Sequence, residues 1–142
     1  MTEKKVSKRF SAVLDNLHPM MAFISGQSRE NGFDEEATQQ ILLASEEALV
    51  NVVSYAYPSE ESGDLEIACM SHGKGHMGLV FRDHGLAFNP LNEVKEVDIN
   101  ASIDQREIGG LGVFIIKNTM EDVRYERIDG SNVFSMTKRA SL

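Results

Sequence analysis

Three polar side chains in an otherwise apolar stretch could do chemistry together. Glu47, Asn51 and Tyr55 recur every four residues, so in a helix they lie along one stripe. A carboxylate, an amide and a phenol at the edge of a core lower stability unless something polar faces them. An amide oxygen can ligate Mg²⁺ and a carboxylate can accept a proton, so the stripe suits a magnesium-bound triphosphate. The alternative is that these groups pair with a neighbouring sheet or with solvent.

A second candidate site follows a strand-like run. Asp83 comes directly after this run, which ends near Arg82, and the segment continues through His84 and Gly85 to Pro90. The carboxylate could accept a hydrogen bond from an exocyclic amine such as that of adenine, and a glycine lets a ligand approach the backbone closely. Asp, Gly, Asn and Pro are also the usual turn residues, so a plain turn is the alternative.

Closely spaced glycines form the third cluster. Gly109, Gly110 and Gly112 surround Leu111 immediately before a helical pattern. The backbone N–H groups and the positive dipole end at a helix N-terminus bind phosphate. The segment lacks the Gly-Lys-Ser/Thr signature of a P-loop, and no strand leads directly into it as the Rossmann fingerprint requires. A flexible hinge is the other interpretation, and both can hold.

Hydrophobic periodicity predicts two helices in the first 57 residues. Apolar residues at helical spacing predict an amphipathic helix over Phe10–Glu30, in which Pro19 starts a turn or causes a kink. Asn31-Gly32 breaks this helix. Asp34 is expected to be the N-cap of a second helix that runs to Tyr57.

The remaining patterns predict strands, a lid and a short helix. Asp129-Gly130 is a strong hairpin-turn signal between two strand-like runs. The polar, weakly periodic stretch 91–108 is expected to be a functional lid or a disordered segment, and 113–120 a short helix. Together the patterns predict an α+β fold: a two-layer sandwich in which helices cover one face of a mostly antiparallel sheet. The expected strands are 4–10, 64–71, 77–82, 123–127 and 133–138.

Composition narrows the class of protein. A chain of 142 residues is short for a divided core, so one domain over 1–142 is expected. With 22 acidic and 14 basic residues the net charge is −8, which disfavours direct nucleic-acid binding. No run reaches the ~18 apolar residues of a membrane span and no signal-peptide pattern is present, so we expect no membrane association and a cytoplasmic location. The single cysteine, Cys69, is expected to be a reduced packing residue.

In combination, the three clusters carry a family resemblance. They resemble the N, G1 and G2 boxes of the Bergerat-type ATP-binding superfamily, which includes gyrase, histidine kinases and mismatch-repair ATPases. More narrowly, the chain looks like the anti-sigma-factor serine/threonine kinases, and the likeness runs from the first helix to Lys138. The segments that carry it are Glu46–Tyr57, Asp83–Pro90 and Arg106–Gly112, followed by Met120–Val123 and Tyr125.

The resemblance implies the histidine-kinase-like ATPase fold, ATP and Mg²⁺ as cofactors, and a role for each matching residue. Asn51 would ligate the Mg²⁺ that bridges the phosphates. Glu47 would be the general base, and Glu46 is the weaker candidate because it points elsewhere on the helix. Asp83 would bind the adenine amine, and Gly85 would give the ring room.

The resemblance also implies roles in the glycine-rich segment. Gly109, Gly110, Leu111 and Gly112 would hinge an ATP lid over about 91–108 and hold phosphates, and Arg106 would reach the terminal phosphate. Some relatives carry histidine where this chain has Tyr55, which leaves the contact at that position open.

The function that the resemblance implies is an anti-sigma factor with kinase activity. It would phosphorylate an anti-anti-sigma (STAS-type) protein on a hydroxyl residue and sequester a sigma factor. A sensor histidine kinase would need a helical hairpin bearing a phosphoacceptor histidine, and no such segment is present in the sequence. The alternative is a non-catalytic, nucleotide-dependent binding switch of the same fold. A homodimer is possible through apolar residues of the first helix, but these residues (Met20, Met21 and Phe23) suit the core better.

Overall fold

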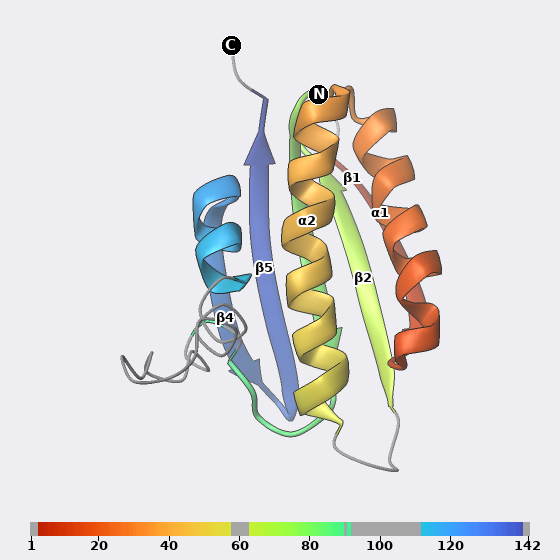
Figure 1. Ribbon diagram of the computed structural model, residues 1–142, viewed down its shortest axis with the longest axis vertical. Helices are drawn as coiled ribbons and strands as arrows, with labels where there is room; N and C mark the ends of the chain where they lie inside the picture. Colours follow the sequence, from red (N-terminus) through yellow and green to blue (C-terminus); the bar gives the residue numbers. More distant parts are fainter. Residues whose placement is uncertain (1–2, 58–62, 90, 92–111, 141–142) are drawn as a thin grey trace, which may run out of the picture.

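The computed structural model describes residues 3–57, 63–89, 91 and 112–140, and it shows a sheet with helices on one side (Figure 1). The sheet has five strands in the order β1-β2-β3-β5-β4, and every neighbouring pair is antiparallel. This confirms the predicted α+β class. The strands are β1 (Lys4–Ser11), β2 (Asp64–Ser71), β3 (His76–Asp83), β4 (Glu121–Ile128) and β5 (Ser131–Arg139).

Both predicted hairpins are present. A short turn connects β2 to β3, which pair with each other, and Asp129-Gly130 connects β4 to β5. Asp129 has φ 47° and Gly130 has φ 81°, the two positive values that a type I′ hairpin turn requires. The central pairing of β3 with β5 joins the two hairpins and places Asp83 opposite Asn132.

The helices differ from the prediction mainly at their ends. A helix was expected from Phe10, but β1 continues to Ser11, and a 3-10 turn, η1 (Leu14–Asn16), precedes α1 (Leu17–Glu30). Phe10 pairs with Leu65 in the sheet and is buried, so strand pairing overrides the helical spacing of its apolar neighbours. Pro19 then lies in the first turn of α1, where a missing N–H is tolerated.

The second helix also ends differently from the prediction. α2 (Glu35–Asn51) gives way to a π-helical turn, η2 (Val52–Ala56). Tyr55 therefore lies beyond the regular part of the helix, in a turn with a wider hydrogen-bonding repeat. A further helix covers residues 112–119, close to the predicted 113–120.

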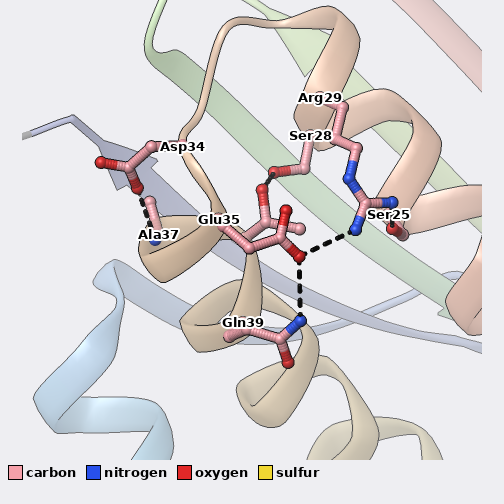
Figure 2. Close-up of polar contacts among 8 residues, drawn as sticks. Ser25, Ser28, Arg29, Asp34, Glu35, Ala37 and Gln39 are labelled. Carbon is pink, nitrogen blue, oxygen red and sulfur yellow. Dashed lines mark hydrogen bonds and ion pairs between the residues drawn. The ribbon is translucent and has the colours of Figure 1, made fainter.

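The junction of α1 and α2 follows the sequence signals closely (Figure 2). Gly32 has φ 87°, and the Asp34 side chain caps α2 by accepting a hydrogen bond from the Ala37 N–H at 2.8 Å. Arg29 of α1 forms an ion pair with Glu35 of α2 at 3.0 Å. Beside it, the hydroxyls of Ser28 and Thr38 are 2.8 Å apart, and this buried pair also joins the two helices.

The core lies between the helices and the sheet. Met20 is fully buried there, and Met21 and Phe23 pack against the same cluster, which confirms that these residues belong to the core. Cys69 is a free thiol, also buried, as expected. In the described part of the chain, no helix combines the length and the apolar character that crossing a membrane requires.

Candidate functional site

The C-terminal end of α2 carries the first group of candidate residues. Glu47 and Asn51 lie one turn apart on α2, both half-buried, whereas Glu46 is exposed. Burial raises the pKa of the Glu47 carboxyl, and the negative charge of Glu46 raises it further. A carboxylate with a raised pKa is a better proton acceptor than an exposed one.

Glu47 lies against Gly112, which belongs to the helix described over 112–119. A Cβ atom added at Gly112 would lie 2.5 Å from Glu47 Oε2, so only glycine fits at this position without displacing the carboxylate. Two site residues that are far apart in the sequence are thus in contact. Gly112 therefore lies next to the carboxylate of Glu47, which is one turn from Asn51 on α2.

The π-helical turn after α2 contacts the segment that follows Asp83. The Leu86 N–H donates to the Ala56 carbonyl at 2.8 Å. A Cβ at Gly85 would lie 2.2 Å from the same carbonyl oxygen. Gly85 is therefore required by the close approach of the Ala56 backbone, a structural reason that is separate from any room it leaves for a ligand.

Asp83 lies at the end of the strand, as predicted, although β3 extends one residue further than expected and includes it; its side chain is almost fully buried. Its Oδ1 atom accepts hydrogen bonds from the Gly85 N–H and from Asn132 Nδ2, both at 2.9 Å. Burial raises the pKa of the carboxyl, and the two hydrogen bonds lower it by a smaller amount. A buried carboxylate of this kind favours a ligand that donates a hydrogen bond.

The segment after Asp83 is held by hydrogen bonds from three directions. The His84 N–H donates to the Tyr57 hydroxyl at 2.8 Å, and the Phe88 N–H donates to Asn132 Oδ1 at 3.1 Å. Arg127 of β4 donates to the Gly85 carbonyl at 2.9 Å. The turn interpretation of this segment is therefore incomplete, because its backbone is fixed by partners from β4, from β5 and from the residue that follows η2.

Asn132 and Tyr57 were missed as positioning residues by the sequence reasoning. Asn132 lies in β5 and is buried, and Tyr57 joins Asp64 of β2 to the segment after Asp83 through its hydroxyl. One available signal was a polar asparagine at the start of a β-branched and aromatic run, where asparagine is depleted. The signal becomes informative only when the pairing of β3 with β5 places Asn132 opposite Asp83.

Tyr55 makes an aromatic contact. Its ring stacks on Phe88, with centroids 5.1 Å apart and an interplanar angle of 21°. Phe88 is buried, whereas Tyr55 is exposed. The contact at this position, which the sequence left open, is thus a stacking contact that joins the π-helical turn to the segment after Asp83.

Part of the predicted site lies outside the described residues. Arg106, Gly109, Gly110 and Leu111 fall there, as does the expected lid over 91–108 apart from Leu91. The structure brings together the other predicted residues in two linked groups. Glu47, Asn51 and Gly112 form one, and Asp83 and Gly85 form the other, with η2 between them.

A magnesium ion fits the residues at the end of α2. Among the described residues, no group of three or more His, Cys, Asp or Glu side chains is placed to hold a metal ion. Mg²⁺ commonly takes only one or two protein ligands and completes its shell with water and substrate phosphates. Asn51 can supply an amide oxygen, and it lies one turn from Glu47, whose carboxylate contacts Gly112.

The fold and this site define a class of protein. A helix-borne acid and amide, a buried aspartate at a strand end and a helical glycine in contact with the acid are combined on a sheet with helices on one side. Residues 10–138 match the histidine kinase-like ATPase domain family, and the chain belongs to this family. The match covers nearly the whole chain and confirms the family resemblance of the sequence motifs.

Curated relatives narrow the comparison. The chain is 30% identical over 118 residues to the serine-protein kinase RsbW of Listeria monocytogenes serovar 1/2a, covering 81% of this chain and 74% of that protein. It is 26% identical over 143 residues to the serine-protein kinase RsbW of Bacillus mycoides, covering 97% and 88%. The similarity therefore extends over most of both chains.

Proposed function

We propose that this protein is an ATP-dependent serine/threonine protein kinase that acts on an anti-anti-sigma (STAS-type) protein and also binds a sigma factor. The relatives named as serine-protein kinases support the class of reaction. The observation that carries the proposal is the position of Glu47, half-buried and in contact with Gly112. This contact supports a reaction in which a proton acceptor lies beside a backbone that binds phosphate.

Glu47 is the general base of the proposed reaction. The hydroxyl oxygen of the protein substrate forms a bond to the γ-phosphorus of ATP, and the bond from this phosphorus to the bridging oxygen breaks. ADP leaves with the electron pair of the broken bond, and the hydroxyl proton passes to the Glu47 carboxylate. Its raised pKa brings the carboxyl closer to the pH of the cell, where a general base works best.

The other residues bind and orient the nucleotide. Asp83 accepts a hydrogen bond from the adenine amine, and the backbone at Gly112 contacts a phosphate. Asn51 holds Mg²⁺, which neutralises charge on the phosphates when it is bound. We also assign phosphate binding to Arg106, Gly109, Gly110 and Leu111, on the basis of the sequence resemblance.

Phosphate transfer tests the proposed kinase activity. The protein is incubated with Mg²⁺, γ-labelled ATP and a STAS-domain protein encoded near its gene, and label on serine or threonine is measured. Glu47→Gln should lower transfer by about 10²–10⁴-fold while ADP binding is retained. The matched control is Glu46→Gln, an exposed neighbour that should transfer label normally.

Two outcomes would contradict the kinase. If the Glu47→Gln variant transfers phosphate at the normal rate, Glu47 is not the general base. Nucleotide binding without transfer to any STAS candidate would favour the non-catalytic switch.

Sigma-factor binding is tested separately. The net charge of −8 supports a basic partner surface, and an interaction of that kind weakens as salt is raised. Co-purification with a sigma factor that is lost at high salt is the expected result. No association at low salt with any sigma factor of the host would contradict this part of the proposal.

A further inference from the structure

Asn132 forms the centre of a buried hydrogen-bond network around Asp83. It lies directly opposite Asp83 in the β3–β5 pairing and has an exposed fraction of 3%. Its Nδ2 donates to Asp83 Oδ1 at 2.9 Å and to the Leu86 carbonyl at 2.7 Å. Its Oδ1 accepts from the Phe88 N–H at 3.1 Å and from the Tyr125 hydroxyl.

These four contacts fix which way the Asn132 amide points. A side-chain amide has two donor hydrogens and an oxygen with two acceptor positions, and all four are in use here. Reversing the amide would turn its oxygen toward a carboxylate and a carbonyl, and its NH₂ toward the Phe88 N–H. Only the observed orientation satisfies all the partners.

Asn132 also fixes how Asp83 presents its second oxygen. Among the described residues, hydrogen bonds reach only the Oδ1 atom of Asp83, from Asn132 and from the Gly85 N–H. With Oδ1 held from two sides, Oδ2 is the carboxylate oxygen that accepts no hydrogen bond from the described residues. An ionised carboxylate oxygen accepts hydrogen bonds and repels other acceptors.

We infer that Asn132 is a positioning residue: it orients Asp83 so that the site accepts a 6-aminopurine and rejects a 6-oxopurine. The inference rests on the proposed nucleotide site and adds a determinant of base selectivity to it. The exocyclic amine of adenine donates to the oriented Oδ2. A 6-oxo group would place a second acceptor there, which the buried site rejects.

Isothermal titration with ADP and inosine diphosphate (IDP) tests this inference, because the two differ at the 6-position of the base. The natural protein should bind ADP more tightly than IDP. Asn132→Asp has almost the same shape but replaces both donors with a carboxylate that shares a proton with Asp83. It should lose about tenfold or more of the ADP preference, chiefly through weaker ADP binding.

Two further variants separate positioning from general damage. Tyr125→Phe removes one bond to Asn132 Oδ1 and leaves both donors in place, so it should retain the ADP preference. Asn132→Thr keeps one hydroxyl donor in a residue that suits a strand, and it should recover part of the preference. Circular dichroism and thermal melting show whether each variant is folded.

The outcomes distinguish the inference from the proposed function. If the natural protein binds neither nucleotide, the proposed site itself is wrong. Suppose instead that the natural protein prefers ADP. If the folded variants Asn132→Asp and Asn132→Thr then both keep that preference in full, the positioning role is wrong and the proposed site stands. An equal loss of ADP and IDP affinity in both variants would also overturn the inference, since that pattern indicates a structural defect alone.

Discussion

Replacing Asp83 by Asn changes one atom of the buried acceptor and almost nothing of its shape. The carbonyl oxygen of the new side chain can take the place of Oδ1 and still accept from Gly85 and Asn132. Its NH₂ group then takes the place of Oδ2. A donor there would meet the donor of the adenine amine, so the proposed hydrogen bond to the base would be lost and two donors would face each other.

The size of the effect follows from the burial of Asp83, whose exposed fraction is 1%. A lost hydrogen bond that leaves buried groups unsatisfied costs about 1–3 kcal/mol. At 1.4 kcal/mol for each factor of ten, Asp83→Asn should weaken ADP and ATP binding by about 5- to 150-fold. Isothermal titration at fixed Mg²⁺ measures this change directly.

The same variant makes a second, opposite prediction for stability. The pKa of Asp83 is raised in the folded protein, so the folded state holds this proton more tightly than the unfolded state. The protonated Asp83 carboxyl stabilises the folded state at pH values below the ordinary pKa of an aspartate. This contribution is lost as the pH rises through the raised pKa of Asp83 in the folded protein. At neutral pH, therefore, the ionised group opposes folding, and Asp83→Asn should melt no lower than the natural protein.

Asp129→Asn is the matched control, since it makes the same chemical change at an exposed turn. It should leave both nucleotide affinity and melting temperature unchanged. Unchanged ATP affinity in a folded Asp83→Asn variant would refute the assignment of the adenine contact. A large drop in melting temperature would refute the reasoning about the buried charge.

Three further experiments test features of the fold. Gly85→Ala should destabilise the protein by about 1–3 kcal/mol in urea unfolding, because its Cβ would overlap the Ala56 carbonyl; unchanged stability would show that the close approach is not required. Asp34→Ala removes the cap on the Ala37 N–H and should lower the free energy of unfolding by about 1 kcal/mol. Asp34→Ser keeps a capping oxygen and should retain most of that stability. Cys69 is buried, and burial raises its pKa to about 12, so iodoacetamide should label it only after unfolding; rapid labelling of the native protein would contradict its packing.

Local signals in the sequence determined a large part of this structure. The Asp34 cap, the Asn31-Gly32 break and the Asp129-Gly130 turn depend on backbone preferences within a few residues, and all three are present. The positions of Glu47, Asn51 and Asp83 on their elements were also predictable. Helical spacing and the end of a strand are properties of short segments.

Segment ends were predicted less well, because tertiary pairing moves them. The apolar spacing near Phe10 fits a helix, yet its pairing with Leu65 extends β1 to Ser11. In the same way, a continuous helix to Tyr57 is compatible with the sequence, but the structure ends the regular helix at Asn51 and inserts a π-helical turn. The Ala56 carbonyl at the end of that turn accepts the Leu86 N–H, a contact between distant segments.

The sequence by itself determined the chemical groups of the site, their local elements and the family to which they belong. Only the tertiary structure decided which of those groups meet. Glu47 contacts Gly112, and Asn132 holds Asp83, because packing and the β3–β5 pairing join segments that are far apart along the chain. Such contacts depend on the joint fit of whole elements, which the spacing of residues within one segment does not specify.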